Sequence, residues 1–292
     1  MAAQEGKIVR ITSRDRVIFP DAGFTKGELA DYYALAAPLM LPFMAGRPLS
    51  LVRCPQGRAK KCFYQKHDTG GFGPHVHSIP ITEKEGDTEP YLYVEDAAGI
   101  LGCVQMGTIE FHAWPSRCTD LEAPDRLVID LDPDAGLDFA EVKRAAFAIR
   151  ARLAETGLAS FALLTGGKGV HVIAPFAAGP SWEELRDFAR ALATDLAEAE
   201  PARFTATMSK AKRKGKIFID CLRNQRGNTA VLPYSARARS GAPVAVPIAW
   251  DKLDAAPSAH PFSIADIEML LRRAQHESLA DWGMAEQEFP RG

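Results

Sequence analysis

The stretch DRLVIDLDPDAG, residues 125–136, alternates apolar and polar side chains as a β-strand does. Its leucines and isoleucine share one face of such a strand, so Asp130 and Asp132 point together from the other face. Pro133 ends the strand and leaves the two carboxylates at its exposed end. Carboxylates at this spacing can bind a hard divalent cation, although a short acidic run fits a solvated turn equally well.

An EF-hand calcium loop is another interpretation of this run, because the acids Asp130, Asp132, Asp134 and Glu141 have the ligand spacing of such a loop. An EF-hand needs a left-handed glycine in the middle of the loop, where this sequence has Ala135. The residues before Asp130 also have the pattern of a strand, whereas an EF-hand requires a helix there. We therefore exclude an EF-hand.

The segments C-terminal to this run predict both helices and strands. They are a helix over 142–153, a hairpin of strands over 161–165 and 170–174, a helix over 182–199 capped by Ser181, and a strand over 217–220. This order indicates an α+β fold rather than a doubly wound parallel sheet.

The N-terminal half predicts a helix that begins at Thr25 and runs to about residue 36, with Glu28 at the capping-box position. Pro38 and Pro42 are expected to prevent the helix from continuing beyond that point. The other expected elements are a helix over 96–105, a strand over 108–114 that carries Glu110, His112 and Trp114 on one face, and a helix over 265–274.

The composition is that of a soluble globular protein, with 47% hydrophobic and 25% charged residues. No apolar run approaches the ~18 residues that span a bilayer, and the N-terminal stretch lacks the apolar core of a signal peptide. We therefore expect a cytosolic protein without a membrane partner. The five cysteines are odd in number and include no C-x-x-C pair, so free thiols are expected.

Positive charge is concentrated between Arg203 and Arg239. This segment has ten lysines and arginines and one acid, Asp220, whereas the whole chain has a net charge of -2. Such a local excess is typical of a phosphate-binding surface, since a solvated face usually mixes both signs. Asp220 is then either a salt-bridge partner of these cations or a third metal ligand, and the residues alone slightly favour the salt bridge.

The run TGGKGVH, residues 165–171, is a second candidate for phosphate binding. Its glycines allow backbone N–H groups to approach a phosphate, and Lys168 adds a positive charge. No Ser or Thr follows the lysine and a strand comes next, so this is not a Walker A loop, and a plain hairpin turn remains an alternative. His171 is as compatible with a core histidine as with a ligand.

The run FYQKH, residues 63–67, interleaves aromatic and cationic side chains after a basic stretch from Arg58 to Lys61. This mixture suits the stacking of bases together with neutralisation of a nucleic-acid backbone. Ordinary core aromatics on a short strand are the alternative. Taken together, clustered acids, a glycine–lysine turn and a basic segment favour metal-assisted phosphoryl transfer on nucleic acid.

Three stretches resemble a known family: DLDPD at 130–134, TGGKGVHV at 165–172 and MSKAKRKGKIFIDCLRNQRGNTAVLPYSARAR at 208–239. They are similar to the polymerase domain of bacterial ATP-dependent DNA ligase D, a member of the archaeo-eukaryotic primase superfamily, and the resemblance runs from about Arg14 to Leu253. It implies a primase-polymerase fold of mixed and antiparallel sheets flanked by helices. Residues 1–292 would form a single catalytic domain that ends in a helical segment over 254–292.

The resemblance also implies roles for individual residues. Two divalent metal ions, Mn²⁺ or Mg²⁺, would be held by the catalytic carboxylates of Asp130, Asp132 and Asp220. The incoming nucleotide would contact His112, Thr165, Gly166, Gly167, Lys168, His171, Arg213, Arg237 and Arg239. DNA would contact Phe63, Tyr64, Lys66, Arg223 and Arg226, with the two aromatic residues stacking on the templating base. A downstream 5′-phosphate would be recognised by Lys26, with Arg16 and Ser13.

Four of these positions depart from the family's usual residues, with Thr165 for Ser, Tyr64 for Phe, Arg16 for Lys and Ser13 for Asn. None of these changes removes a metal ligand or a cation.

The implied function is template-dependent addition of nucleotides, preferentially ribonucleotides, to a primer 3′-OH at gaps and double-strand breaks in non-homologous end joining. The partners would be nucleoside triphosphates and gapped or broken duplex DNA with a 5′-phosphate, with Ku and a DNA ligase as further candidates, in the bacterial cytosol or nucleoid. The alternatives are a DNA-end-binding module without catalysis and a metal-dependent nuclease.

Overall fold

A six-stranded sheet carries the carboxylates that the sequence singles out. The computed structural model describes residues 9–177 and 179–290. The strand order of this sheet is β11-β12-β8-β10-β9-β14, and only β11 and β12 pair in parallel. Its strands are β8 (Arg126–Pro133), β9 (Phe161–Leu164), β10 (Val170–Pro175), β11 (Phe204–Thr205), β12 (Ile217–Asp220) and β14 (Val246–Ile248).

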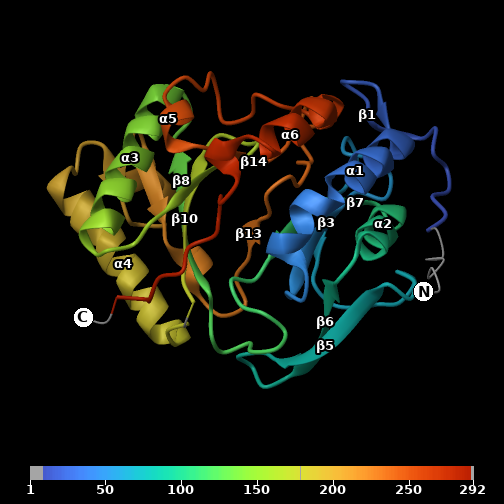
Figure 1. The fold of residues 1–292 in the computed structure, drawn as a ribbon, viewed down its shortest axis with the longest axis horizontal. Helices are drawn as coiled ribbons and strands as arrows, with labels where there is room; N and C mark the ends of the chain where they lie inside the picture. The colour runs from blue at the N-terminus through green and yellow to red at the C-terminus, as the bar shows by residue number, and fades with distance from the viewer. Residues whose placement is uncertain (1–8, 178, 291–292) are drawn as a thin grey trace.

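Two long helices, α3 (Phe139–Glu155) and α4 (Trp182–Ala199), pack against one face of this sheet (Figure 1). Their apolar stripes meet Leu127, Ile129 and Leu131 of β8 in the main hydrophobic core. Because side chains alternate along a strand, Asp130 and Asp132 point away from the two helices. The core contact of α3 and α4 thus fixes the direction in which the carboxylates point.

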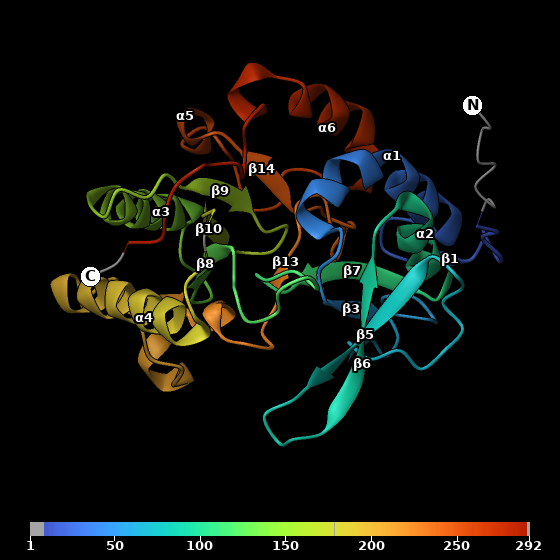
Figure 2. The same ribbon diagram turned by 60° about the horizontal axis from the view of Figure 1, so that its bottom comes forward.

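A second sheet of four strands, in the order β13-β7-β3-β4, faces the open side of the first. Its strands are β3 (Leu49–Arg53), β4 (Phe63–Gln65), β7 (Thr108–Ala113) and β13 (Ala230–Val231). Helices α1 (Lys26–Met44) and α2 (Ala97–Gln105) pack on each other and close this half of the molecule (Figure 2). The functional residues of both sheets are thereby turned toward one cleft.

The remaining elements extend the edges of this frame. A long hairpin of β5 (Val76–Thr82) and β6 (Thr88–Val94) projects from the four-stranded sheet (Figure 2), and β1 (Val17–Phe19) pairs with β2 (Phe24–Thr25) before α1. The C-terminal part contributes α5 (Trp250–Leu253) and α6 (Ile267–Ala274). Short 3₁₀ turns are at Lys210–Arg213, Leu222–Asn224, Ile264–Asp266 and Glu277–Leu279. Within the described residues, no helix is long and apolar enough to cross a membrane.

The predicted α+β class and the predicted strands and helices around Asp130 are confirmed, as is the Thr25–Glu28 capping box at the start of α1. The expected break at Pro38 and Pro42 is wrong, because both prolines lie inside α1. Each proline removes one backbone hydrogen bond, and the buried face of the helix, with Met40 and Met44 fully buried, holds the last turns in place.

The expectation of free thiols is wrong for Cys54 and Cys62, which form a disulfide. The pairing of Arg53 with Phe63 in β3 and β4 places the two cysteines at the two ends of the loop between these strands. Spacing in the sequence does not reveal this pair, because the register of the two strands creates it. Cys103, Cys118 and Cys221 are free.

Reduction of this disulfide is expected to lower the free energy of unfolding by about 2–3 kcal/mol, the chain-entropy value for a loop of this size. Urea denaturation of the wild type with and without a thiol reductant measures the difference. The Cys54→Ser/Cys62→Ser variant is the control and should not respond to reductant. An unchanged midpoint for the reduced wild type would contradict the prediction.

Candidate active site

Three carboxylates lie on one face of two neighbouring antiparallel strands. Asp220 of β12 pairs across with Asp130 of β8, and Phe218 pairs with Asp132. Residues that pair across neighbouring strands point to the same face of the sheet. This register therefore brings Asp220 to the face of Asp130 and Asp132. The two acidic positions that lie about ninety residues apart in the sequence thus meet at one site.

Cations and a histidine surround these carboxylates. The Nη2 atom of Arg223 lies 3.1 Å from Asp130 Oδ2 and 3.9 Å from Asp220 Oδ2. His171 Nε2 lies 3.4 Å from Asp130 Oδ1, and Arg213 Nη1 lies 3.8 Å from Asp132 Oδ2. In the part of the chain that the structure describes, no group of three or more His, Cys, Asp or Glu side chains is drawn together tightly enough to hold a metal ion as it stands.

The three carboxyl groups differ in their pKa values. Burial alone would raise the pKa of Asp130, but His171 and Arg223 together hold it below its ordinary value. The pKa of Asp132 is raised, first by burial and then by the charge of Asp130, and burial also raises the pKa of Asp220. The negative charge of Asp130 also raises the pKa of Asp220, so the carboxylates repel one another across their common face. The oxygen donors and their common face therefore fit a hard divalent cation.

A cleft of about 340 Å³ opens beside the carboxylates, between the two sheets. Asp130, Asp132 and Arg223 lie along one side of it, and His112 of β7 lies on the other. The rest of its lining comprises Tyr64, Thr165, Gly167, Lys168, Gly169, His171, Thr229, Val231, Arg237 and Arg239. Most of the residues predicted to bind metal or nucleotide are thus in one place, with Asp220, Gly166 and Arg213 just outside this lining.

The glycine–lysine turn between β9 and β10 is built by close backbone contacts. Gly166 has a left-handed φ of 66°, and a Cβ at Gly169 would lie 2.1 Å from the carbonyl oxygen of Leu131. The hydroxyl of Thr165 donates to the Gly169 carbonyl at 2.8 Å. This hydroxyl therefore closes the turn, while the Lys168 side chain is exposed toward the cleft.

Glu110 is a residue of this site that the sequence analysis did not assign a role. Its Oε2 atom lies 2.9 Å from His112 Nε2 and 3.0 Å from Arg237 Nε, and its Oε1 accepts the Ala238 N–H at 2.7 Å. Arg237 in turn donates to the Thr165 carbonyl. Glu110 thus fixes two cleft side chains, and its place on the same strand face as His112 was the available signal.

The electrostatics of Glu110 follow from this pairing. Its side chain is 8% exposed, so burial alone would raise its pKa, but the hydrogen bond from His112 and the charge of Arg237 lower the pKa to about 2. The pKa of His112 is lowered, mainly by burial. A neutral imidazole beside an ionised carboxylate is therefore the expected state of this pair near neutral pH.

The predicted DNA-contacting residues are distributed around the cleft. Tyr64 is 72% exposed and lines it, with its ring 6.1 Å from the ring of His112. Phe63 is also exposed, but neighbouring residues on a strand point to opposite sides, and Phe63 lies beside Arg53 instead. Lys66 and Arg226 are held in ion pairs with Glu83 and Glu122.

The predicted 5′-phosphate residues lie on the far side of the four-stranded sheet, near the start of α1. Lys26 is 3% exposed, and its Nζ donates to the carbonyl and side-chain oxygens of Gln105 at 2.9 and 2.8 Å. Burial, with a smaller effect of Arg16, lowers the pKa of Lys26. Arg16 and Lys26 line one small pocket together with Cys54, whereas Ser13 is an exposed turn residue with a left-handed φ of 52°.

A known protein family matches most of this chain. The profile of the family described as LigD, primase-polymerase domain, matches residues 25–278. The chain belongs to the LigD primase-polymerase family. The match extends past the C-terminal limit of 253 expected from the sequence, and Ser13 and Arg16 lie outside it.

Relatives of this family are similar over most of the chain. The multifunctional non-homologous end joining protein LigD of Pseudomonas aeruginosa is 39% identical over 90% of the chain, and that of Mycolicibacterium smegmatis is 34% identical over 84%. The chain spans 31% and 32% of the length of these relatives. A solved structure, the polymerase domain of Mycobacterium tuberculosis ligase D in complex with DNA, matches with a TM-score of 0.85 and 31% identity, over 92% of this chain and 96% of that one.

Proposed function

We propose that this chain is a template-dependent nucleotidyltransferase that extends a primer 3′-OH at gaps and double-strand breaks during non-homologous end joining. The observation that carries the proposal is the placement of Asp130, Asp132 and Asp220 on one face of β8 and β12, beside a cleft lined with cations. Membership of the LigD primase-polymerase family supports the same reaction.

Asp130, Asp132 and Asp220 would hold two divalent metal ions, Mn²⁺ or Mg²⁺. Bound there, the ions would supply activation of the 3′-OH and neutralisation of the departing pyrophosphate. Arg223 now neutralises part of the charge of Asp130 and Asp220. Arg223 also lines the cleft, so it could bind a phosphate of the nucleotide once metal ions neutralise the carboxylates.

The triphosphate would lie along the cationic side of the cleft, against Lys168, Arg237 and Arg239. Glu110 fixes the ring of His112 at the cleft wall, where the other ring nitrogen would accept a hydrogen bond from the nucleotide. Tyr64, exposed at the rim, would stack on a base. The basic 3₁₀ turn at Lys210–Arg213 and the exposed Lys214 add a surface for the DNA backbone, with binding that weakens as salt rises.

The test is primer extension on a short gapped duplex with a downstream 5′-phosphate, in Mn²⁺, with ribonucleotides and deoxyribonucleotides supplied separately. Templated addition of the complementary nucleotide supports the proposal, and the ratio of the two lanes measures the proposed ribonucleotide preference. Shortening of the primer without added triphosphates would identify a nuclease. A gel shift of the duplex without extension would identify an end-binding module instead.

Lys26 is proposed to recognise the 5′-phosphate. Lys26→Ala is expected to reduce the preference for a 5′-phosphorylated over a 5′-hydroxyl gap by about tenfold, because one charge-assisted hydrogen bond is lost. Fluorescence anisotropy with both duplexes gives the ratio. Lys26→Arg, which keeps the charge, should retain most of the preference for the 5′-phosphorylated gap. An unchanged ratio of the two affinities in Lys26→Ala would refute this role.

We also propose that residues 1–292 act as a single catalytic domain, because one continuous hydrophobic cluster joins α1, both sheets and α6. The P. aeruginosa relative is about three times as long as the matched part. We therefore propose that the chain acts at a double-strand break together with Ku and with a DNA ligase activity. The ligase activity would belong to the same chain or to a partner protein.

A further inference from the structure

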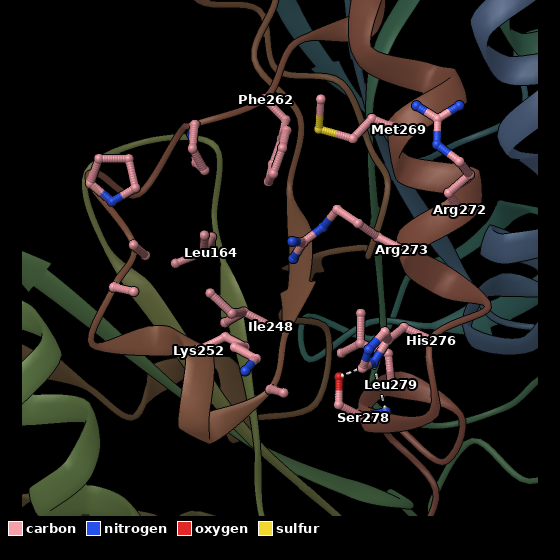
Figure 3. A pocket seen from close by; sticks show the side chains of 15 residues that line it. Leu164, Ile248, Lys252, Phe262, Met269, Arg272, Arg273, His276, Ser278 and Leu279 are labelled. Atoms are coloured by element: carbon pink, nitrogen blue, oxygen red, sulfur yellow. Dashed lines mark hydrogen bonds between the residues drawn. The ribbon is translucent and has the colours of Figure 1, made fainter.

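A second cavity, of about 520 Å³, lies between β14, α5 and α6, apart from the catalytic cleft (Figure 3). Leu164, Ile248, Phe262 and Leu279 give it apolar walls. It shares none of its lining residues with the cleft that holds Asp130 and Lys168. A cavity of this size accommodates one or two large side chains or a small ligand, and the proposed polymerase reaction makes no use of it.

The charged residues of this cavity all have one sign. Lys252, Arg272 and Arg273 line it, and no Asp or Glu does. Among the described residues, neither arginine takes part in an ion pair, and Lys252 contacts only its neighbour Asp251 at 3.1 Å. An apolar cavity whose two arginines have no ion-pair partner is complementary to an apolar group that carries negative charge beside it.

Arg273 is the cation that points most directly into the cavity (Figure 3). Its guanidinium lies over the ring of Phe262 at 4.9 Å, and its Nε atom is buried without a hydrogen-bond partner. Figure 3 shows the side chain pointing into the cavity between Phe262 and Ile248. A guanidinium that points into a cavity and has no ion-pair partner among the described residues can pair with a carboxylate that a ligand brings.

We propose that this cavity docks an acidic segment of a partner protein. One large apolar side chain of the segment enters beside Arg273, against Leu164 and Ile248. Flanking carboxylates pair with Arg272, Arg273 and Lys252. Met269, 44% exposed at the rim, offers a flexible side chain that adapts to the entering group. Leu164, Ile248 and Leu279 are aliphatic, and the guanidinium of Arg273 lies over the ring of Phe262. These walls therefore favour a protein side chain over nucleic acid, because bases need free aromatic surfaces for stacking.

The cavity also adjoins the loop that holds the glycine–lysine turn between β9 and β10 in place. Its wall includes Ala256 and Phe262, and the chain between them holds the turn: the Ala259 carbonyl accepts the Gly166 N–H at 2.9 Å, and His260 Nδ1 lies 2.8 Å from the Gly167 carbonyl oxygen. A segment docked in the cavity therefore contacts the loop that positions Lys168.

The test uses a fluorescein-labelled, terminally capped peptide, Asp-Glu-Trp-Leu-Glu-Asp, titrated with the full chain and followed by anisotropy. We expect saturable binding that weakens with added salt. Arg272→Glu/Arg273→Gln should weaken it by about tenfold, whereas Arg190→Glu, which changes an exposed cation on α4, should leave it unchanged. A peptide with Ser-Ser in place of Trp-Leu should bind about tenfold more weakly as well, because it lacks the anchor.

Several results would overturn the proposal. One is equal affinity for the Trp-Leu and Ser-Ser peptides, which would mean that only charge is recognised, and another is no binding of either. Displacement of the peptide by duplex DNA would place the peptide on the DNA surface instead. Self-association of the chain that Arg272→Glu/Arg273→Gln abolishes in sedimentation would make a second copy the occupant. If that variant has a lowered Tm, Lys252→Glu, whose side chain is 61% exposed, replaces it.

Discussion

Asp130→Ala is expected to lower the rate of templated nucleotide addition by about a thousandfold or more, equivalent to ~4 kcal/mol of transition-state stabilisation. The reason is its position. Asp130 pairs across the sheet with Asp220, and Asp132 follows it on the same face, so it is the carboxylate best placed to be shared by two cations. Single-turnover primer extension in Mn²⁺ measures the loss.

The fold should survive this substitution, because Arg223 keeps Asp220 within 3.9 Å as a partner. Binding of the gapped duplex should change little, since the basic surface is untouched. Asp134→Ala is the matched control: it lies in the same acidic run, but its carboxylate accepts only backbone N–H groups, including that of Gly215 at 2.8 Å. Equal losses in the two variants would mean that the run acts through its general charge and not as a metal site.

Local patterns in the sequence predicted most of the frame. The alternation in 127–131, the Thr25–Glu28 capping box, the Ser181 cap and the glycine turn each depend on residues close together in the chain, so their elements appear where expected. The family resemblance further predicted that Asp220 joins Asp130 and Asp132 in one site. Which strands lie side by side depends on packing, and this is why Glu110, one strand residue among many in the sequence, was not recognised as the anchor of His112 and Arg237.

The errors also have physical causes. Pro38 and Pro42 were expected to end a helix that tertiary packing maintains, and Cys54 and Cys62 become partners only through the register of β3 and β4. Lys66 and Arg226 stay predicted DNA contacts. Their ion pairs with Glu83 and Glu122 could not be predicted, because the partners lie far apart in the sequence. The opposite orientation of Phe63 and Tyr64, in contrast, follows from strand alternation alone.

Glu110→Ala is expected to affect both stability and activity. Breaking a buried ion pair by removing one partner costs about 3–5 kcal/mol, because Arg237 and His112 are left without their acceptor. Nucleotide addition by the folded fraction should fall about a hundredfold, since Arg237 also holds the Thr165 carbonyl at the turn. Glu122→Ala is the matched control: its carboxylate also pairs with an arginine, but it is 63% exposed, so the cost should stay below about 1 kcal/mol.

Acid titration separates the charge of Glu110 from its shape. Its pKa is lowered from 4.5 to about 2 in the folded protein. A lowered folded pKa means that the stabilisation is fully present above pH 4.5 and is lost as the pH falls toward 2, on the order of 3 kcal/mol in all. Glu110→Gln keeps the shape without the charge, so its Tm should fall less steeply than that of the wild type across this window. Parallel curves of Tm against pH for the two proteins would show that Glu110 does not carry its charge in the folded state. They would contradict the ion pair between Glu110 and Arg237.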